Sequence, residues 1–244
     1  MVLIIFSIMK LREHKSTNRG GSNFGWLKSY HTFSFGNYFN PAQTHFGVLR
    51  VINDDTVSPG AGFGTHPHKD MEIISIPLSG ALAHNDSMGN SSIISAGEVQ
   101  VMSAGTGIRH SEMNASNDDF VEFLQIWIFP DKNGIEPRYG QAKTEVDAAK
   151  NKWNLIVGPE GSESKVWIHQ DAYLHLSKFE SGRNAVYTLN KSNNGVYIFV
   201  IKGSVTLDEI TLNERDGVGI EEAEHFELSF NEETEILLME VPMF

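Results

Sequence analysis

Two pairs of potential metal ligands lie in the first half of the chain, each shortly after a glycine-rich segment. His66 and His68 follow the segment GAGFG, and His110 and Glu112 follow the segment GTGIR. In an extended chain, positions i and i+2 project from the same face, so the two members of each pair point together. Three imidazoles and one carboxylate suit a divalent first-row transition metal. We therefore predict one metal site with these four residues as its ligands.

The composition restricts which other chemistries are open to the chain. Its 244 residues include no cysteine, which excludes disulfides, thiolate nucleophiles and cysteine-held zinc or iron–sulfur sites. The formal net charge is −12 and the sequence pI is about 5.2, whereas proteins that bind nucleic acid or anionic membranes usually present a basic face. We expect no direct nucleic-acid partner and no membrane partner. The glycine fingerprints of nucleotide and dinucleotide sites are also missing.

The elements that must position the four ligands are predicted to be β-strands. Short apolar segments alternate with turn residues throughout, and the one segment typical of a helix is short, over residues 145–152. Many short strands with few helices indicate a sandwich or a barrel. The tripeptide Asn-Asp-Asp at 53–55 is predicted to form a turn. The predicted strands cover residues 46–52, 71–78, 97–102, 121–129, 166–176, 196–207 and 236–241.

An internal repeat indicates two related β domains. Residues 73–82 and 197–207 both read as an apolar strand, a polar-Gly turn and a second strand, and another glycine-led strand follows each copy. The copies are separated by a charged segment that carries proline and glycine. We predict an N-terminal domain over residues 1–141 and a C-terminal domain over residues 142–244.

The first nine residues, MVLIIFSIM, form an apolar run that needs its own interpretation. The run is too short to span a bilayer, and it lacks the basic start and the cleavage site of a secretory signal. It is either a first β-strand or a few residues upstream of an alternative start at Met9. We expect a soluble cytoplasmic protein.

The segments around the ligand candidates resemble the pirin family of the cupin superfamily. GFGTHPHKDMEI is close to the first cupin motif, and VMSAGTGIRHSE resembles the second, although its histidine arrives two residues late and Ser103 stands where proline is usual. The stretches GWLKSYHTFSFGNYFNP, LRVINDD, SMGN, LQIWIFP and PRYGQ also match. The resemblance is strong over residues 25–141 and rests elsewhere on length and strand pattern. It is greatest to bacterial pirins described as quercetin 2,3-dioxygenases.

This resemblance implies an all-β bicupin, with two antiparallel β-barrel (jelly-roll) domains and metal only in the N-terminal one. The family's ligands carry over onto His66, His68, His110 and Glu112. A glutamate placed like Glu72 is a ligand in many cupins but not in pirins, so Glu72 is expected to be structural. We expect one metal ion per chain, with iron as the first choice and manganese, nickel, cobalt, copper and zinc left open.

Two functions follow from the resemblance and the predicted site. The first is a dioxygenase that opens the central ring of flavonols such as quercetin with O2, in which Glu112 also acts as a general base. The alternative is a metal-containing, redox-responsive regulator that binds partner proteins. Access to the metal separates the two, because an enzyme needs a pocket for a flavonol and a sensor does not. We expect a monomer in either case.

The second copy of the repeat is expected to lack a metal site. At the offsets from Gly203 that correspond to the first histidine pair stand Leu189 and Lys191, which are unsuitable ligands. His31 is expected to lie in the core or at a rim. The aromatic-rich segment 26–39 is expected mainly to pack the barrel, with a part in a cavity wall as the alternative. His45 is expected to have the same role as His31. His169 and His175 are expected to be surface or core residues, and His225 is isolated in the sequence.

Overall fold

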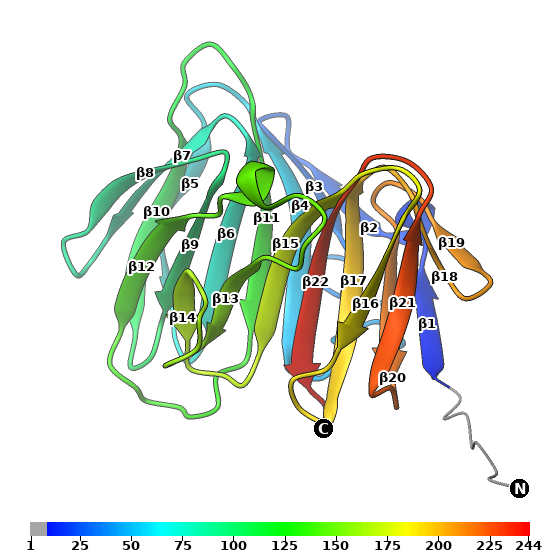
Figure 1. Ribbon diagram of the computed structural model, residues 1–244. Helices are drawn as coiled ribbons and strands as arrows, with labels where there is room; N and C mark the ends of the chain where they lie inside the picture. The colour runs from blue at the N-terminus through cyan, green and yellow to red at the C-terminus, as the bar shows by residue number, and fades with distance from the viewer. Residues whose placement is uncertain (1–8) are drawn as a thin grey trace, which may run out of the picture. The chain divides into compact units, whose positions relative to one another are not determined.

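The computed structural model describes residues 9–244, and almost all of its regular structure is β-strand (Figure 1). The all-β expectation is therefore confirmed. The chain divides into two compact units. The first unit consists of residues 19–145 and 155–172. The second consists of the residues up to 18 together with 146–154 and 173–244.

The division differs from a single boundary between residues 141 and 142. The first crossing, at 145/146, lies close to that point, but residues 10–18 join the second unit and residues 155–172 join the first. Strand β1 (Lys10–His14) belongs to the second unit because it pairs antiparallel with β20 (Gly217–Glu221), about 200 residues later in the chain (Figure 1). The apolar run over residues 1–9 lies outside the described residues except for Met9.

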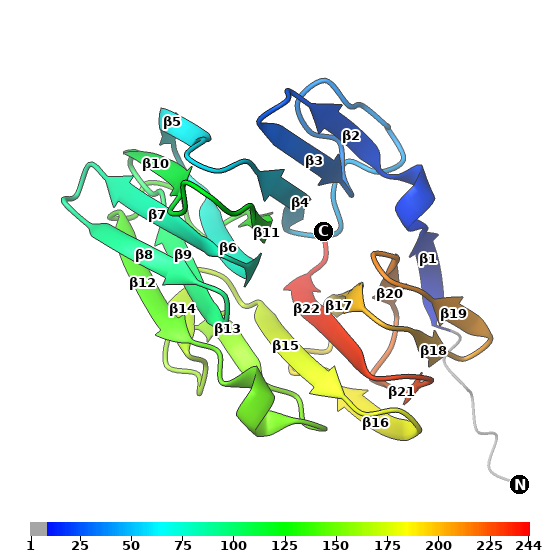
Figure 2. The same cartoon turned by 90° about the horizontal axis from the view of Figure 1, so that it is seen from above.

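Two antiparallel sheets form the first unit and lie against each other (Figure 2). The larger sheet has seven strands in the order β12-β9-β6-β11-β4-β3-β2. These are β2 (Gly20–Asn23), β3 (Leu27–His31), β4 (Leu49–Val57), β6 (Glu72–Ser79), β9 (Glu98–Ser103), β11 (Val121–Ile128) and β12 (Arg138–Lys143). The smaller sheet has the order β5-β10-β7-β8. Its strands are β5 (Gly62–His68), β7 (Ala81–Asp86), β8 (Ser91–Ser95) and β10 (Ile108–Asn114).

Apolar side chains pack between these two sheets over part of their area. Leu82 and Ile94 of the smaller sheet contact Val57 and Phe123 of the larger one, and all four are at most 1% exposed. Burial of this size stabilises each side chain by about 1.5–3 kcal/mol. The apolar core therefore holds the two faces in place without any contribution from a metal. A short parallel pair, β13 (Leu155–Pro159) and β14 (Val166–Ile168), completes the unit.

Most predicted strands are present, with shifted ends, but the predicted turn at residues 53–55 is wrong. These residues continue β4, which runs to Val57. Asn53 and Asp55 are 3% and 4% exposed, and their side chains are hydrogen-bonded to neighbouring strand β3. Polar side chains that bond across a sheet face can stay in a strand, which the local turn preference of Asn and Asp does not reveal.

The second unit repeats the two-sheet arrangement with an apolar interior. One sheet contains the strand order β1-β20-β17-β22-β15, and the other has the order β16-β21-β18-β19. The rings of Phe179 and Phe230 stack at 4.1 Å in a core of aliphatic and aromatic side chains. The remaining strands are β15 (Tyr173–Phe179), β16 (Arg183–Thr188), β17 (Asn194–Lys202), β18 (Val205–Leu207), β19 (Ile210–Leu212), β21 (His225–Phe230) and β22 (Thr234–Pro242). The predicted helix is reduced to a 3-10 turn, η2 (Val146–Ala149), and a second such turn is η1 (Ser16–Asn18).

The predicted repeat is visible in the turn that follows β6 and the turn that follows β17. Gly80 and Gly203 both have positive φ, at 70° and 84°, which suits glycine. A Cβ atom on Gly80 would lie 3.0 Å from the carbonyl oxygen just before β11, and one on Gly203 would lie 2.5 Å from the carbonyl oxygen just before β22. The same close approach therefore recurs at the same place in both units, as expected for a bicupin.

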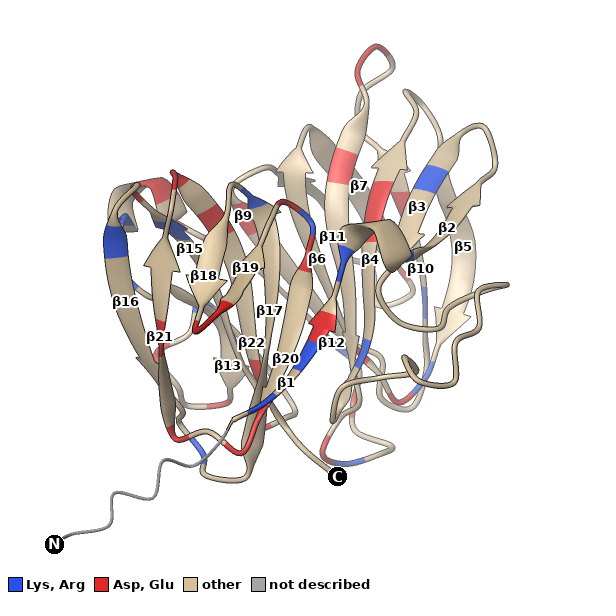
Figure 3. Ribbon diagram, turned by 90° about the vertical axis from the view of Figure 1, so that its right-hand side faces the viewer, with Lys and Arg blue, Asp and Glu red and all other residues tan. Residues whose placement is uncertain are grey.

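Charged side chains are dispersed over the strands. In Figure 3, the basic positions are spread over several strands and loops, with acidic positions among them. No helix within residues 9–244 has the length and apolar character needed to cross a membrane.

Candidate metal centre

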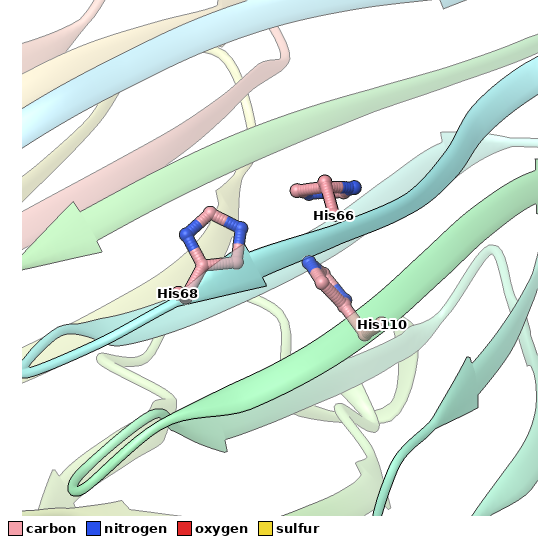
Figure 4. A group of neighbouring side chains, drawn as sticks. All are labelled: His66, His68 and His110. Carbon is pink, nitrogen blue, oxygen red and sulfur yellow. The ribbon is translucent and has the colours of Figure 1, made fainter.

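Strands β5 and β10 bring the three predicted histidine ligands together. The strands pair antiparallel with His66 opposite His110, and the side chains of His66, His68 and His110 gather beside the two strands (Figure 4). The candidate ligand atoms of the three histidines all lie within 4.8 Å of one another. A register shift follows between His110 and Glu112, where a bulge re-aims the strand. His68 and His110 are 42 residues apart in sequence, and they come together because β5 and β10 pair in this register.

The protonation and bonding of the three imidazoles fit a metal cation. His66 Nδ1 donates to the Gly64 carbonyl oxygen at 2.8 Å, which leaves the lone pair of Nε2 free. Burial lowers the pKa of His68 to about 4, and burial together with the neighbouring histidines lowers the pKa of His110 to about 3. Both ring nitrogens of His110 are buried without a hydrogen-bond partner. The lowered pKa values of His68 and His110 and the close clustering of the three rings suit a divalent transition metal, which binds neutral imidazoles.

Glu112 is not part of the three-histidine group. It lines a cavity that His66 and His68 also line. Its two carboxylate oxygens accept hydrogen bonds from Ser75 Oγ and Gln125 Nε2, each at 2.7 Å. Burial raises the pKa of this carboxyl group above its ordinary value. The two donors come from β6 and β11, so Glu112 reaches across from one sheet to the other. They hold the carboxylate in one orientation beside the histidines.

His66, His68 and Glu112 line a cavity of about 350 Å³. This volume falls within the range of small-molecule sites. One part of its wall is aromatic, with Phe35, Phe63 and Trp127, and Phe24 stands at the rim with 61% of its surface exposed. Phe35 meets Trp127 edge-to-face at 5.4 Å. The aromatic segment 26–39 therefore contributes to a cavity wall as well as to packing.

The structure adds polar residues that the sequence analysis missed. His84 is fully buried on β7 directly opposite Glu112, its ring lies 5.5 Å from that of His110, and its Nε2 lies 3.1 Å from an Asp86 oxygen. Leu82 and His84 are two residues apart on β7, so they share a face of the strand. This alternation with an apolar residue is the sequence signal that could have predicted a buried His84. Asp55 was assigned to a turn, yet it lines the cavity.

Glu72 is fully buried outside the histidine group. Its Oε2 accepts a hydrogen bond from Ser103 Oγ at 2.7 Å, and its Oε1 has no partner. Burial raises the pKa of Glu72 to about 7. This placement agrees with a structural residue. Ser103, which replaces the usual proline of the motif, supplies the contact that holds Glu72 there.

The second unit has no corresponding group. Within residues 9–244 the three histidines of the first unit are the single cluster whose geometry fits a metal. Leu189 and Lys191 follow strand β16 and offer no such set. His175 is 8% exposed and packs at 5.4 Å from the ring of Tyr187, so it is a core residue.

The fold and the site define a bicupin with a histidine cluster in one barrel. The pirin family model matches residues 12–128, and the model described as quercetinase C-terminal cupin domain matches residues 155–241. The chain belongs to the pirin family.

Relatives match over nearly the whole chain. A protein named quercetin 2,3-dioxygenase from Escherichia coli strain K12 is 43% identical over 228 residues, which cover 93% of this chain and 97% of that protein. The structure of the bacterial pirin YhhW in complex with nickel(II), also from E. coli, has 40% identity and a TM-score of 0.91, and the match covers 96% of this chain and all of that one. YhaK from E. coli has 27% identity and a TM-score of 0.73, with 91% and 98% of the two chains covered.

Proposed function

We propose that this chain is a metal-dependent dioxygenase that opens the central ring of flavonols such as quercetin with O2. The observation that carries the proposal is the cluster of His66, His68 and His110, two of which, His66 and His68, line a cavity of about 350 Å³. The name of the 43%-identical relative supports the reaction. The cavity also favours an enzyme over a regulator that reads only the redox state of its metal, because such a sensor has no need of a pocket for a flat aromatic molecule.

We propose His66, His68, His110 and Glu112 as the ligands of one divalent transition metal, with iron as the native ion. The nickel(II) complex of the E. coli pirin supports a first-row metal of this kind. When bound, the metal would act as a Lewis acid that lowers the pKa of a hydroxyl group on the substrate. Four protein ligands leave room for substrate oxygens in a five- or six-coordinate arrangement.

The residues around the ligands would bind and orient the flavonol. Trp127 and Phe35 form an aromatic wall against which a flat ring system can pack, and Phe63 closes another side. Glu112 would accept the proton of the substrate hydroxyl at a carboxylate oxygen, as a general base. Ser75 and Gln125 hold that carboxylate in place, so that it need not reorient during the reaction.

The experiment is anaerobic reconstitution of the purified chain with each candidate metal, followed by addition of quercetin and O2. We expect one metal to support quercetin consumption with release of an equal amount of carbon monoxide. The same metal should be lost from a His110→Ala variant, together with the activity. Quercetin that is bound but never consumed with any metal would overturn the enzyme proposal and favour the regulator.

A further inference from the structure

We propose that the cavity carries a second, polar subsite on strand β4, in which Asn53 and Asp55 hydrogen-bond hydroxyl groups on the substrate ring that does not reach the metal. The site would then select polyhydroxylated flavonols over a flavonol that carries only the 3-hydroxyl group. This inference rests on the proposed function and names the substrate class that the same cavity takes.

The subsite lies on the sheet that faces the histidine strands. Ser75, Gln125, Asn53 and His31 are successive cross-strand partners on β6, β11, β4 and β3, so they form one row on one face of the sheet. Glu112 accepts hydrogen bonds from the first two members of the row. The last three members line the cavity. The row therefore leads from the carboxylate at the metal centre along the opposite wall.

Asp55 stands two residues beyond Asn53 on the same strand and thus on the same face. It also lines the cavity, and Ser29 on β3 donates a hydrogen bond to its Oδ1. The second carboxyl oxygen has no partner among the described residues. Burial raises the pKa of Asp55 to about 7, and a carboxyl group keeps an acceptor oxygen in either protonation state, so this group can accept a hydrogen bond from a phenolic hydroxyl group.

The side-chain oxygen of Asn53 accepts a hydrogen bond, whereas its amide nitrogen has no partner within residues 9–244. Burial keeps the pKa of His31 below its usual value, so this imidazole is neutral, and its Nδ1 donates to Asn53 Oδ1 at 2.8 Å. His31 Nε2 is then an acceptor for Ser22 Oγ at 3.1 Å. Within residues 9–244, the Asn53 amide nitrogen makes no hydrogen bond. It therefore presents donors to the cavity beside the acceptor of Asp55.

A structural role alone does not account for this arrangement. The hydrogen bonds to strand β3 use one side-chain oxygen of each residue, and within residues 9–244 one donor group of Asn53 and one acceptor of Asp55 have no partner and are not sealed from the cavity. Both belong to cavity-lining residues, whereas the paired atoms are those directed toward β3. Strand β3 thus positions the two side chains, and the open atoms are available to a ligand.

The test compares quercetin with 3-hydroxyflavone, which has the same ring system and only the 3-hydroxyl group. The variants are Asn53→Ala and Asp55→Asn in the metal-loaded full chain. Each should lower the ratio of kcat/KM for quercetin to kcat/KM for 3-hydroxyflavone by about tenfold, as the loss of one hydrogen bond predicts. The matched control is Asp54→Asn, the neighbour on the same strand, whose carboxylate is paired with Arg19. The control should leave the ratio unchanged.

A binding measurement separates failure of this inference from failure of the proposed function. Both flavonols are titrated under anaerobic conditions, with quenching of tryptophan fluorescence as the readout, since Trp127 lines the cavity. The wild-type chain should bind quercetin more tightly than 3-hydroxyflavone, and both variants should remove that preference, even if no flavonol is turned over. Variants that keep circular dichroism and metal content but also keep the wild-type preference would overturn the subsite.

Discussion

At the scale of single residues, contact with the cavity separates two buried carboxylates, Glu112 and Glu72. Glu112 and Glu72 are both buried and accept hydrogen bonds from serine hydroxyls, from Ser75 and Ser103 respectively. Glu112 lines the cavity, whereas Glu72 does not, so only Glu112 can meet a substrate. The same physical cause, loss of hydration, raises the pKa of both groups, and their different surroundings give them different roles.

Replacement of Glu112 by glutamine separates a base from a mere ligand. The Glu112→Gln variant keeps an oxygen that can coordinate but loses nearly all basicity. The amide of Gln125 can rotate to accept from the new side chain. We expect at least part of the metal to remain and quercetin turnover per bound metal to fall by about 10²–10⁴-fold. The measurement is turnover with metal quantified in the same sample. Normal turnover per metal would show that Glu112 does not take the proton.

Replacement of Glu72 tests its structural role through pH. The pKa of Glu72 is about 7 in the folded protein, above its ordinary value of 4.5. The folded state therefore holds the proton more tightly than the unfolded state, and stability is lost as pH rises through this window. Glu72→Gln removes that loss. The variant should gain about 1–3 kcal/mol in free energy of unfolding, relative to wild type, between pH 4.5 and pH 8.

Urea unfolding at the two pH values measures the effect of the Glu72 change. The control is Glu122→Gln on β11, an exposed glutamate whose replacement should show no such pH dependence. Metal content should stay at the wild-type level in Glu72→Gln. If the metal is lost, Glu72 is a ligand and the structural assignment is wrong.

At the scale of elements, the pairing of β5 with β10 makes the site. The strands approach closely at Gly62, where a Cβ atom would lie 2.4 Å from the carbonyl oxygen of Glu112. At Gly64, two residues along β5, a Cβ atom would meet nothing within 4 Å. The two glycines thus differ in function although they lie in one short motif. One permits the strand contact and the other supplies the carbonyl oxygen that orients His66.

This difference between Gly62 and Gly64 gives a matched pair of variants. Gly62→Ala should push the strands apart, destabilise the fold by about 1–3 kcal/mol and weaken metal binding by at least about tenfold, because the histidines no longer converge. Gly64→Ala should change neither quantity appreciably. Thermal unfolding and metal titration of the two variants check this. Equal effects in both would mean that the close approach does not set the site.

At the scale of the whole chain, the first unit carries the three-histidine cluster and the cavity, whereas the described part of the second unit holds no such cluster. Both units are built from two antiparallel sheets and share the glycine turn that follows β6 in the first unit and β17 in the second. The second unit is filled by stacked and aliphatic side chains such as Phe179 and Phe230. These side chains form the apolar core of the second unit.

The number of metal ions bound per chain tests whether only the first unit holds a metal site. We expect close to one tightly bound ion per chain, and we expect metal to raise the melting temperature of the wild-type chain by mass action. His68→Ala should remain folded by circular dichroism, because two apolar cores supply most of the stability, but should show no melting shift with metal. Two tight ions per chain would contradict the assignment of a single site, and global unfolding of His68→Ala would make the metal structural.

The sequence by itself indicated the strand-rich class, the repeat and the three histidines that the structure brings together, and it predicts Glu112 as the fourth residue of the site. These follow from local patterns: apolar segments of strand length, glycine turns at matching offsets, and polar pairs at i and i+2, such as His66 and His68. Each pattern spans a few residues, so the physics that produces it is present in the local sequence. The resemblance to pirins then added the reaction.

Only the tertiary structure decided which distant residues share a face. It assigned β1 to the second unit, moved Asn53 and Asp55 from a turn to a cavity wall, and placed His84 beside His110. These outcomes depend on strand pairings between residues far apart in sequence, and a shift of one residue in register would turn every side chain to the opposite face. Register is set by the packing of whole sheets, and no local pattern reports it.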